Sequence, residues 1–219
     1  MNVVLFGATG MVGQGVLREC LLDPEVDTVL AIGRGPMGQR HDKLREIVHQ
    51  NLRDLAPIEA ELSDLAACFF CLGVASAGIS EQDYRRVTYD ITLAAAQTLV
   101  KLNPGMTFIY VSGAGADSTE TSRTMWARVR GQTENALLRL PFKGVYVFRP
   151  AGIQPLHGIT SRTRAYRIFY VLLKPVLPLL RAMLPKYITT TEKLGRAMLS
   201  VAKRGYSKKV LESGDINAV

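Results

Sequence analysis

The sequence is poor in cysteine and has no long hydrophobic segment. Only three of its 219 residues are cysteines, which is too few for a disulfide framework. It contains no uncharged apolar stretch of about 18 residues, so we expect no membrane-spanning helix. Residues 1–6 follow no basic segment and run into glycines, unlike a secretory signal peptide. We therefore expect a cytoplasmic protein.

Acidic residues are scarce in the C-terminal third of the chain. Residues 1–156 contain 15 Lys and Arg against 16 Asp and Glu, whereas residues 157–209 contain 12 Lys and Arg against Glu192 alone. The net charge of +8 therefore comes from one region, and few aromatic residues are interleaved with it for base stacking. This pattern predicts that nucleic acid is not a partner.

Metal ligands are scarce as well. The chain has three histidines, and Cys68 and Cys71 form its one closely spaced cysteine pair. Residues three apart in a strand point to opposite faces, so these two thiols should not converge on one ion. We expect no metal site and interpret both cysteines as core residues.

What the sequence does contain is an alternation of apolar strands and amphipathic helices. Short apolar segments predict strands at 2–6, 27–32, 45–49, 67–72, 106–111 and 144–148. Helices are predicted at 11–22, 80–102, 123–140 and 190–203, the last opened by a capping box from Thr189 to Glu192. This order predicts an α/β fold, a Rossmann-type doubly wound parallel sheet with helices on both faces and a small C-terminal helical appendage.

Three glycines follow the first predicted strand in the pattern G-x-x-G-x-x-G. In a strand-to-helix turn, Gly7 permits the tight bend, Gly10 admits a pyrophosphate, and Gly13 lets the helix pack close to the strand. The helix N-terminus then offers free N–H groups to the phosphates. The context predicts a dinucleotide-binding domain over residues 1–156, completed by the C-terminal appendage over 157–219 as a substrate or lid region.

The end of the second predicted strand bears on the choice of nucleotide. An NAD-binding site tends to have an acidic residue there for the ribose 2′-hydroxyl. This chain has Ile32-Gly33-Arg34-Gly35, and the guanidinium of Arg34 is suited to a 2′-phosphate. We expect NADP(H) to be preferred, with NAD(H) as the alternative.

Several motifs together resemble one superfamily. They are the glycine loop, Gly33-Arg34, Cys71-Leu72-Gly73, Tyr110-Val111-Ser112 and Phe148-Arg149-Pro150. Over about residues 1–156 the chain is similar to the atypical short-chain dehydrogenase/reductases, in their nucleoside-diphosphate-sugar-epimerase-like branch. The resemblance implies an NAD(P)-binding oxidoreductase or epimerase-like enzyme and does not specify a substrate.

The resemblance also implies roles for individual residues. Ser112 matches the substrate-orienting serine, and Pro150 and Ile153 would border the nicotinamide. The implied cofactor-binding residues are Gly7, Thr9, Gly10, Met11, Val12, Gly13, Arg34, Asn51, Leu52, Leu72, Gly73, Val74, Arg130, Pro150 and Ile153.

The catalytic pair of the superfamily is missing. Its Tyr-x-x-x-Lys aligns with Trp126 and Arg130, and no Tyr-x-x-x-Lys occurs between Ser112 and Arg149. An indole N–H donates a hydrogen bond but does not exchange a proton at neutral pH, whereas arginine can still hold ribose hydroxyls. We therefore assign Ser112, Trp126 and Arg130 to a non-standard catalytic site.

Two functions fit this altered pair. One is an enzyme in which another group moves the proton, with Tyr84, Tyr89 and His157 as candidates. The other is a protein that senses NADP(H) without turnover and signals through a partner surface. The partner is then a small-molecule substrate or none.

Residues 166–184 are apolar, with Arg167, Lys174 and Arg181 at intervals of seven, and are interrupted by Pro175 and Pro178, which predicts two short helices. A basic amphipathic surface of this kind can lie on an anionic membrane. For residues 160–186 we prefer a lid, a substrate subdomain or a dimer surface to this membrane contact, so an oligomer stays open.

Overall fold

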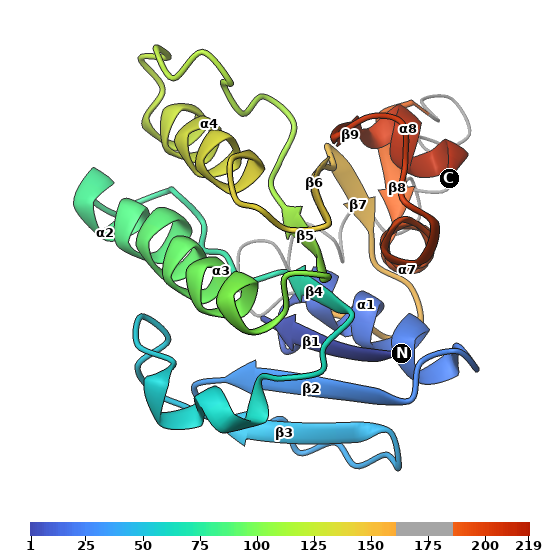
Figure 1. Ribbon diagram of the computed structural model, residues 1–219. Coiled ribbons are helices and arrows are strands. Elements are labelled where there is room, and N and C mark those ends of the chain that lie inside the picture. Colours follow the sequence, from blue (N-terminus) through green and yellow to red (C-terminus); the bar gives the residue numbers. More distant parts are fainter. Residues whose placement is uncertain (161–185) are drawn as a thin grey trace.

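The computed structural model describes residues 1–160 and 186–219, in which strands and helices alternate (Figure 1). In chain order the elements are β1 (Asn2–Phe6), α1 (Met11–Leu22), β2 (Thr28–Gly33), β3 (Leu44–Val48), η1 (Ala56–Glu61), β4 (Ala67–Phe70), α2 (Glu81–Arg85), η2 (Arg86–Asp90), α3 (Ile91–Leu102), β5 (Thr107–Val111), α4 (Met125–Leu138), β6 (Gly144–Arg149), β7 (Gly152–Gln154), β8 (Ile188–Thr190), α7 (Thr191–Arg204), β9 (Val210–Glu212) and α8 (Ser213–Ala218).

One seven-stranded sheet organises the fold, with the strand order β3-β2-β1-β4-β5-β6-β9. Every neighbouring pair in it is parallel. The chain builds outward from β1 in one direction and from β4 in the other, so the order reverses between these two central strands. Parallel sheets of this kind bind ligands at the carboxyl ends of the strands, next to the reversal. The predicted Rossmann-type fold is confirmed.

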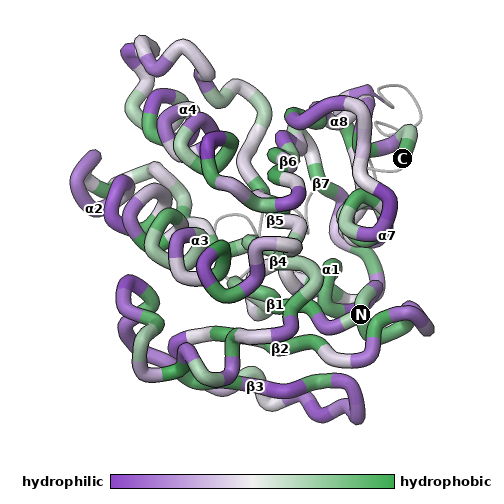
Figure 2. The backbone as a smooth tube through the Cα atoms, in the orientation of Figure 1, coloured by the Kyte–Doolittle hydropathy of each residue, from purple (hydrophilic) through white to green (hydrophobic). Residues whose placement is uncertain are grey.

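The sheet separates two hydrophobic cores. Alternate residues of β1 point to opposite faces, so Val3 and Leu5 join one core and Val4 and Phe6 the other. The first core is covered by α1 and α7, and the second by η1, α3 and α4. Figure 2 shows the apolar strands at the centre, with hydrophilic residues on the outer faces of the helices.

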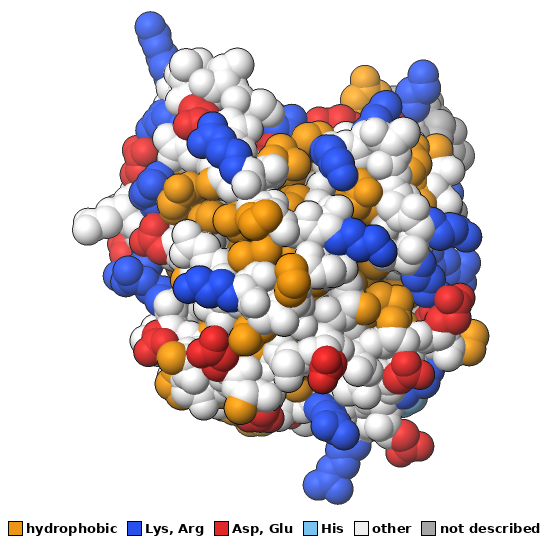
Figure 3. Space-filling view, in the orientation of Figure 1, with side chains coloured by type: hydrophobic (Ala, Val, Ile, Leu, Met, Phe, Trp, Pro, Cys, Tyr) orange, Lys and Arg blue, Asp and Glu red, His pale blue; other side chains and the backbone are white. Residues whose placement is uncertain are grey.

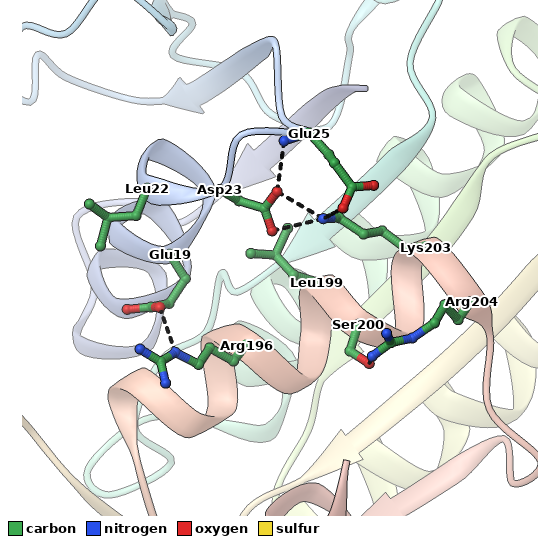
Figure 4. A pocket seen from close by; sticks show the side chains of 9 residues that line it. All are labelled: Glu19, Leu22, Asp23, Glu25, Arg196, Leu199, Ser200, Lys203 and Arg204. Atoms are coloured by element: carbon green, nitrogen blue, oxygen red, sulfur yellow. Dashed lines mark hydrogen bonds and ion pairs between the residues drawn. The ribbon is translucent and has the colours of Figure 1, made fainter.

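Helices α1 and α7 approach each other closely because each has a glycine at the contact. A Cβ added to Gly15 would lie 2.7 Å from Thr191 O, and one added to Gly195 would lie 3.0 Å from Gly15 O. Ion pairs cross the groove of about 410 Å³ beside this contact, where Lys203 Nζ lies 2.8 Å from Asp23 Oδ1 (Figure 4). Lys and Arg side chains are spread over the whole face shown in Figure 3.

The C-terminal part contains more sheet than the sequence predicts. Strand β9 adds a parallel edge to the main sheet beside β6, and β7 pairs with β8 in a second, two-stranded sheet. The capping box predicted from Thr189 does not form, because Thr189 and Thr190 are still extended in β8. Thr190 is the N-cap instead, and its Oγ1 accepts from Lys193 N at 3.0 Å.

Other elements agree with the sequence to within a few residues. The long helix predicted from Ser80 forms as α2, η2 and α3, and Ser80 caps it by accepting from Asp83 N at 3.1 Å. Cys68 and Cys71 are free thiols that face opposite cores, as predicted. The two short helices predicted within 166–184 lie outside the described residues. In the described parts, no helix combines the length and the hydropathy required to cross a bilayer.

Candidate functional site

A cavity of about 550 Å³ lies at the carboxyl ends of β1, β4, β5 and β6. Its walls are the loops that follow these strands, together with the first residues of α1 and with Arg34 after β2, Ile153 of β7 and Arg130 of α4. The lining residues are Gly7, Thr9, Gly10, Met11, Val12, Arg34, Cys71, Leu72, Gly73, Val111, Ser112, Gly113, Arg130, Pro150, Ala151 and Ile153. A neighbouring hollow of about 360 Å³ shares Gly7, Thr9, Arg34 and Leu72 and extends past the end of β2.

The glycine loop shapes one wall of the cavity. Gly7 has φ +80°, and a Cβ added there would lie 2.7 Å from the carbonyl carbon of Cys71. A Cβ on Gly13 would lie 2.0 Å from Gly7 O, so the helix can begin this close to the strand only with glycine. Gly10 is the N-cap of α1 and has no side chain to occupy the first free amides. The loop therefore presents unpaired N–H groups and the positive end of a helix to the cavity.

The charged side chains that line the two hollows are all basic. Arg34 follows β2 directly, is exposed and lines both hollows, and its backbone oxygen accepts from Gln50 Nε2 at 2.5 Å. Neither lining contains an Asp or a Glu among the described residues. The surroundings of the glycine loop therefore favour an anionic ligand.

Arg130 is the side chain that α4 contributes to the cavity. Its Nε donates to Tyr84 Oη at 2.9 Å, while its Nη1 is buried without a hydrogen-bond partner in the described structure. Burial lowers the pKa of Arg130, but the phenols of Tyr110 and Tyr84 raise it, and the net shift is upward. Burial also raises the pKa of Tyr110, so this phenol stays neutral beside the charged guanidinium.

Ser112 is hydrogen-bonded to the buried carboxylate of Glu134. Its Oγ donates to Glu134 Oε1, and Glu134 also accepts from Arg149 Nε at 3.1 Å. Burial lowers the pKa of Arg149, but the hydrogen bond and the charge of Glu134 raise it, and the net shift is upward. A carboxylate paired with arginine only accepts, so the single hydroxyl proton of Ser112 is committed to it. Toward the cavity Ser112 therefore presents oxygen lone pairs and acts as an acceptor.

The sequence matches to curated proteins extend over only part of those proteins. No family model matches the chain. Leucinostatins biosynthesis cluster protein T of Purpureocillium lilacinum is 26% identical over 167 residues, covering 74% of this chain and 61% of that protein. The mitochondrial protein FMP52 of Saccharomyces cerevisiae is 29% identical over 167 residues, covering 75% of this chain and 69% of that protein. The chain thus spans about two thirds of the length of the curated relatives it matches.

Solved structures match almost the whole chain. UDP-glucose 4-epimerase from Thermotoga maritima has a TM-score of 0.72 at 14% identity, over 97% of this chain and 76% of its own. A dTDP-glucose 4,6-dehydratase variant from Streptomyces venezuelae, solved with NAD, has a TM-score of 0.71 at 13% identity, over 97% and 75%. The chain has the fold of the sugar-nucleotide epimerases and dehydratases. The resemblance to the epimerase-like branch of the short-chain dehydrogenase/reductases is confirmed at the level of the fold.

The expected cytoplasmic location is wrong by this comparison. It depended on the absence of recognisable export and membrane signals from the sequence. The FMP52 relatives from Debaryomyces hansenii, Saccharomyces cerevisiae and Emericella nidulans are all named as mitochondrial proteins.

Within this epimerase-like fold, most of the predicted site residues come together. The cavity collects Gly7, Thr9, Gly10, Met11, Val12, Arg34, Leu72, Gly73, Ser112, Arg130, Pro150 and Ile153. Leu52 lines the neighbouring hollow, and Gly13 packs behind the loop. Asn51 and Val74 line neither hollow, and Gln50 occupies the place expected for Asn51.

Trp126 takes a different place from Arg130, although both are on α4. Its ring packs against Gly115, where an added Cβ would lie 3.1 Å from the indole, and it lines neither hollow. Among the other candidates for a proton donor, His157 Nε2 lies 2.6 Å from Glu192 Oε2 and Tyr89 stacks under Arg85. The third candidate, Tyr84, accepts a hydrogen bond from Arg130 of the cavity wall at 2.9 Å.

The buried partner of Ser112 is absent from the sequence predictions. Glu134 is 22 residues from Ser112 in the chain and is fully buried. A signal for it exists, because Trp126, Arg130 and Glu134 recur every four residues and so lie along one side of α4. Without the strand positions, that spacing does not indicate which side faces the sheet.

Proposed function

We propose that the cavity binds a nicotinamide dinucleotide, with the pyrophosphate on the N-terminus of α1. The observation that carries this proposal is the glycine loop, where Gly7 and Gly13 leave no space for a side chain and the first amides of α1 have no cap. These residues fit a dinucleotide because its phosphates need close backbone approach and N–H donors. The NAD bound to the dehydratase of the same fold supports the choice of cofactor.

The 2′-phosphate of NADP(H) would lie against Arg34, at the border of the two hollows. A guanidinium there gives NADPH one or two charge-assisted hydrogen bonds that NADH lacks. Such bonds are worth about 1.5–3 kcal/mol each. We therefore propose NADP(H) as the preferred cofactor.

The chemistry we propose is that of an oxidoreductase or an epimerase-like enzyme with a non-standard proton path. The cofactor, when bound, supplies or takes the hydride. Arg130 holds the ribose hydroxyls in place of the usual lysine, and Ser112 accepts a hydrogen bond from a substrate hydroxyl. The substrate would be a small molecule, and the described residues of the cavity wall include no tyrosine, histidine or carboxylate that could move the proton.

Cofactor binding is tested by titrating the protein with NADPH and with NADH and following nucleotide fluorescence. We expect micromolar binding of NADPH and at least tenfold weaker binding of NADH. Equal affinities would remove the role proposed for Arg34. Failure of both to bind at millimolar concentration would overturn the proposed function itself.

A second function is favoured by the positions of Trp126 and Ser112. Trp126 lies outside the cavity lining and the proton of Ser112 is committed to Glu134, so the site binds without an evident acid. A protein of this kind would sense NADP(H) and signal through a partner. A screen of carbonyl substrates at 340 nm, repeated with the double variant Trp126→Tyr and Arg130→Lys, separates the two: turnover by the native chain supports the enzyme, and turnover by the variant alone supports the sensor.

A further inference from the structure

Tyr84 of α2 is a buried side chain that contacts the cavity wall without lining the cavity. Its phenol oxygen accepts a hydrogen bond from Nε of Arg130 at 2.9 Å. In the part of the chain that the structure describes, the lining of neither hollow includes Tyr84. Tyr84 therefore affects a bound nucleotide only through Arg130.

Arg130 is the long, charged side chain that this hydrogen bond fixes. It extends from α4 to the loops after β4 and β5, where Nη2 lies 4.0 Å from a Cβ added at Gly73 and Nη1 lies 3.8 Å from one added at Gly113. An arginine side chain has many rotamers, and ordering it costs conformational entropy. Because the guanidinium is planar, a partner on Nε also restricts the directions of both terminal nitrogens. Nη1 is buried without a partner in the described structure, so an oxygen of a ligand would satisfy it.

The helix that carries Tyr84 is itself held against α4. Arg85 Nη1 donates to Gln132 Oε1 at 2.5 Å, so a second hydrogen bond joins the same two helices. The π-helical turn η2 (Arg86–Asp90) follows directly after α2. A π turn contains an additional residue, each residue rotates a helix by about 100°, and such turns are frequent at functional sites. Tyr84 thus approaches α4 from a direction that an uninterrupted α-helix continuing into α3 would not give it.

We infer that Tyr84 is a positioning residue for the nicotinamide half of the dinucleotide. By holding Nε, it keeps the terminal nitrogens of Arg130 at the cavity wall, where they would bind the ribose hydroxyls. The inference rests on the proposed function, which places this ribose beside Arg130. It also removes Tyr84 from the candidates for the missing proton donor, because the phenol contacts the guanidinium and lies outside the cavity lining.

The test compares two ligands that differ in the nicotinamide half. NADPH contains it, whereas adenosine 2′,5′-bisphosphate ends at the 5′-phosphate of the adenosine. Both are titrated by calorimetry into the full chain. Tyr84→Phe removes only the phenol oxygen and should weaken NADPH binding about fivefold, while adenosine 2′,5′-bisphosphate stays within about twofold. Arg130→Met should weaken NADPH binding about tenfold or more, and adding Tyr84→Phe to it should cause no further loss.

Gln132→Met is the matched control, because it breaks the other hydrogen bond between α2 and α4 and Gln132 lines neither hollow. It should leave both affinities unchanged, and thermal melting should verify that every variant is folded. Unchanged NADPH binding in Tyr84→Phe, equal losses for the two ligands, or the same loss in Gln132→Met would overturn the inference. So would a further loss when Tyr84→Phe is added to Arg130→Met.

A second measurement needs no variant of Tyr84. The ¹⁵N relaxation of the Arg130 Nε–H group should show an ordered group in the native chain before any nucleotide is added. A group that becomes ordered only when NADPH is present would overturn the inference. If neither ligand binds the native chain, the proposed function fails, and the relaxation measurement still decides whether Tyr84 fixes Arg130.

Discussion

The cavity at the strand ends and the groove between α1 and α7 both contain basic side chains. The two regions differ in whether carboxylates lie beside these side chains. In the groove, Lys203 pairs with Asp23 and Glu25, and Arg196 pairs with Glu19. In the cavity, Arg34 and Arg130 have no carboxylate beside them in the lining. Paired charges hold two helices together, whereas charges left without a partner are available to a ligand. This difference favours the cavity over the groove, whose basic and acidic side chains balance, as the candidate functional site.

The largest expected change in stability comes from the buried ion pair of Glu134 and Arg149. Glu134→Ala should lower the free energy of unfolding by about 3–5 kcal/mol, because it removes the buried counter-ion of Arg149 and leaves that guanidinium only the exposed Glu212 at 3.4 Å. Glu81→Ala removes the partner of Arg128 from a partly exposed pair that joins α2 to α4 and should cost at most about 1 kcal/mol. Urea unfolding of both variants measures the contrast. Similar losses of stability in the two variants would mean that the buried Glu134 pair stabilises the fold no more than the Glu81–Arg128 pair does.

The next largest effect separates two roles of the glycine loop, which are the close packing of α1 and the binding of the nucleotide. Gly13→Ala should destabilise the fold by about 1–3 kcal/mol, since its Cβ would need the space of Gly7 O. Gly10→Ala has more room, with 3.3 Å to Gly7 O, and should leave stability nearly unchanged while it weakens NADPH binding. Unfolding and nucleotide titration of both variants provide the comparison. Loss of stability in Gly10→Ala would contradict the separation.

Nucleotide choice should change without any change in stability. Arg34→Ser should weaken NADPH binding roughly 10- to 100-fold, which corresponds to about 1.4–2.8 kcal/mol, and should leave NADH binding within about twofold. Arg40→Ser is the control, because Arg40 is exposed and lines neither hollow. An equal loss for both nucleotides would indicate a general electrostatic effect.

The smallest expected effect is the change in stability when the Lys203–Asp23 pair in the groove between α1 and α7 is broken. Burial raises the pKa of Asp23, but hydrogen bonds from Lys203 and the Glu25 amide lower it, and the net shift is below the ordinary 3.8. The pair therefore stabilises the fold above pH 3.8, and this stability is lost as the pH falls through the lowered value. Lys203→Met should cost about 0–1 kcal/mol near pH 7, with the difference from the native chain shrinking below pH 4. Melting curves across this pH range check it, and a difference that grows in acid would contradict the assignment.

The sequence predicts the fold well where a segment buries many residues. The strands at the centre of the sheet are apolar on both faces, and the glycine spacing marks the turn after the first of them. Strands β7, β8 and β9 are three residues each, and β9 buries only Leu211, so no periodicity identifies them.

The site is predicted only as far as local motifs extend. The glycine loop and Arg34 are readable because each follows directly on a strand. The contact of Ser112 with Glu134 joins a strand end to the middle of a helix, and the contact of Arg130 with Tyr84 joins two helices. Contacts of this kind depend on how the elements pack, which a single sequence does not contain.

The central claim is that the first amides of α1 bind the phosphates of a nicotinamide dinucleotide. Its most direct test is a two-dimensional ¹⁵N–¹H NMR titration of the full chain with NADPH, with the amides of Met11, Val12 and Gly13 assigned. We expect saturable shifts at these three amides that are larger than those of the α7 residues that line the groove. Unchanged loop amides in the presence of millimolar NADPH, or shifts confined to the groove, would contradict it.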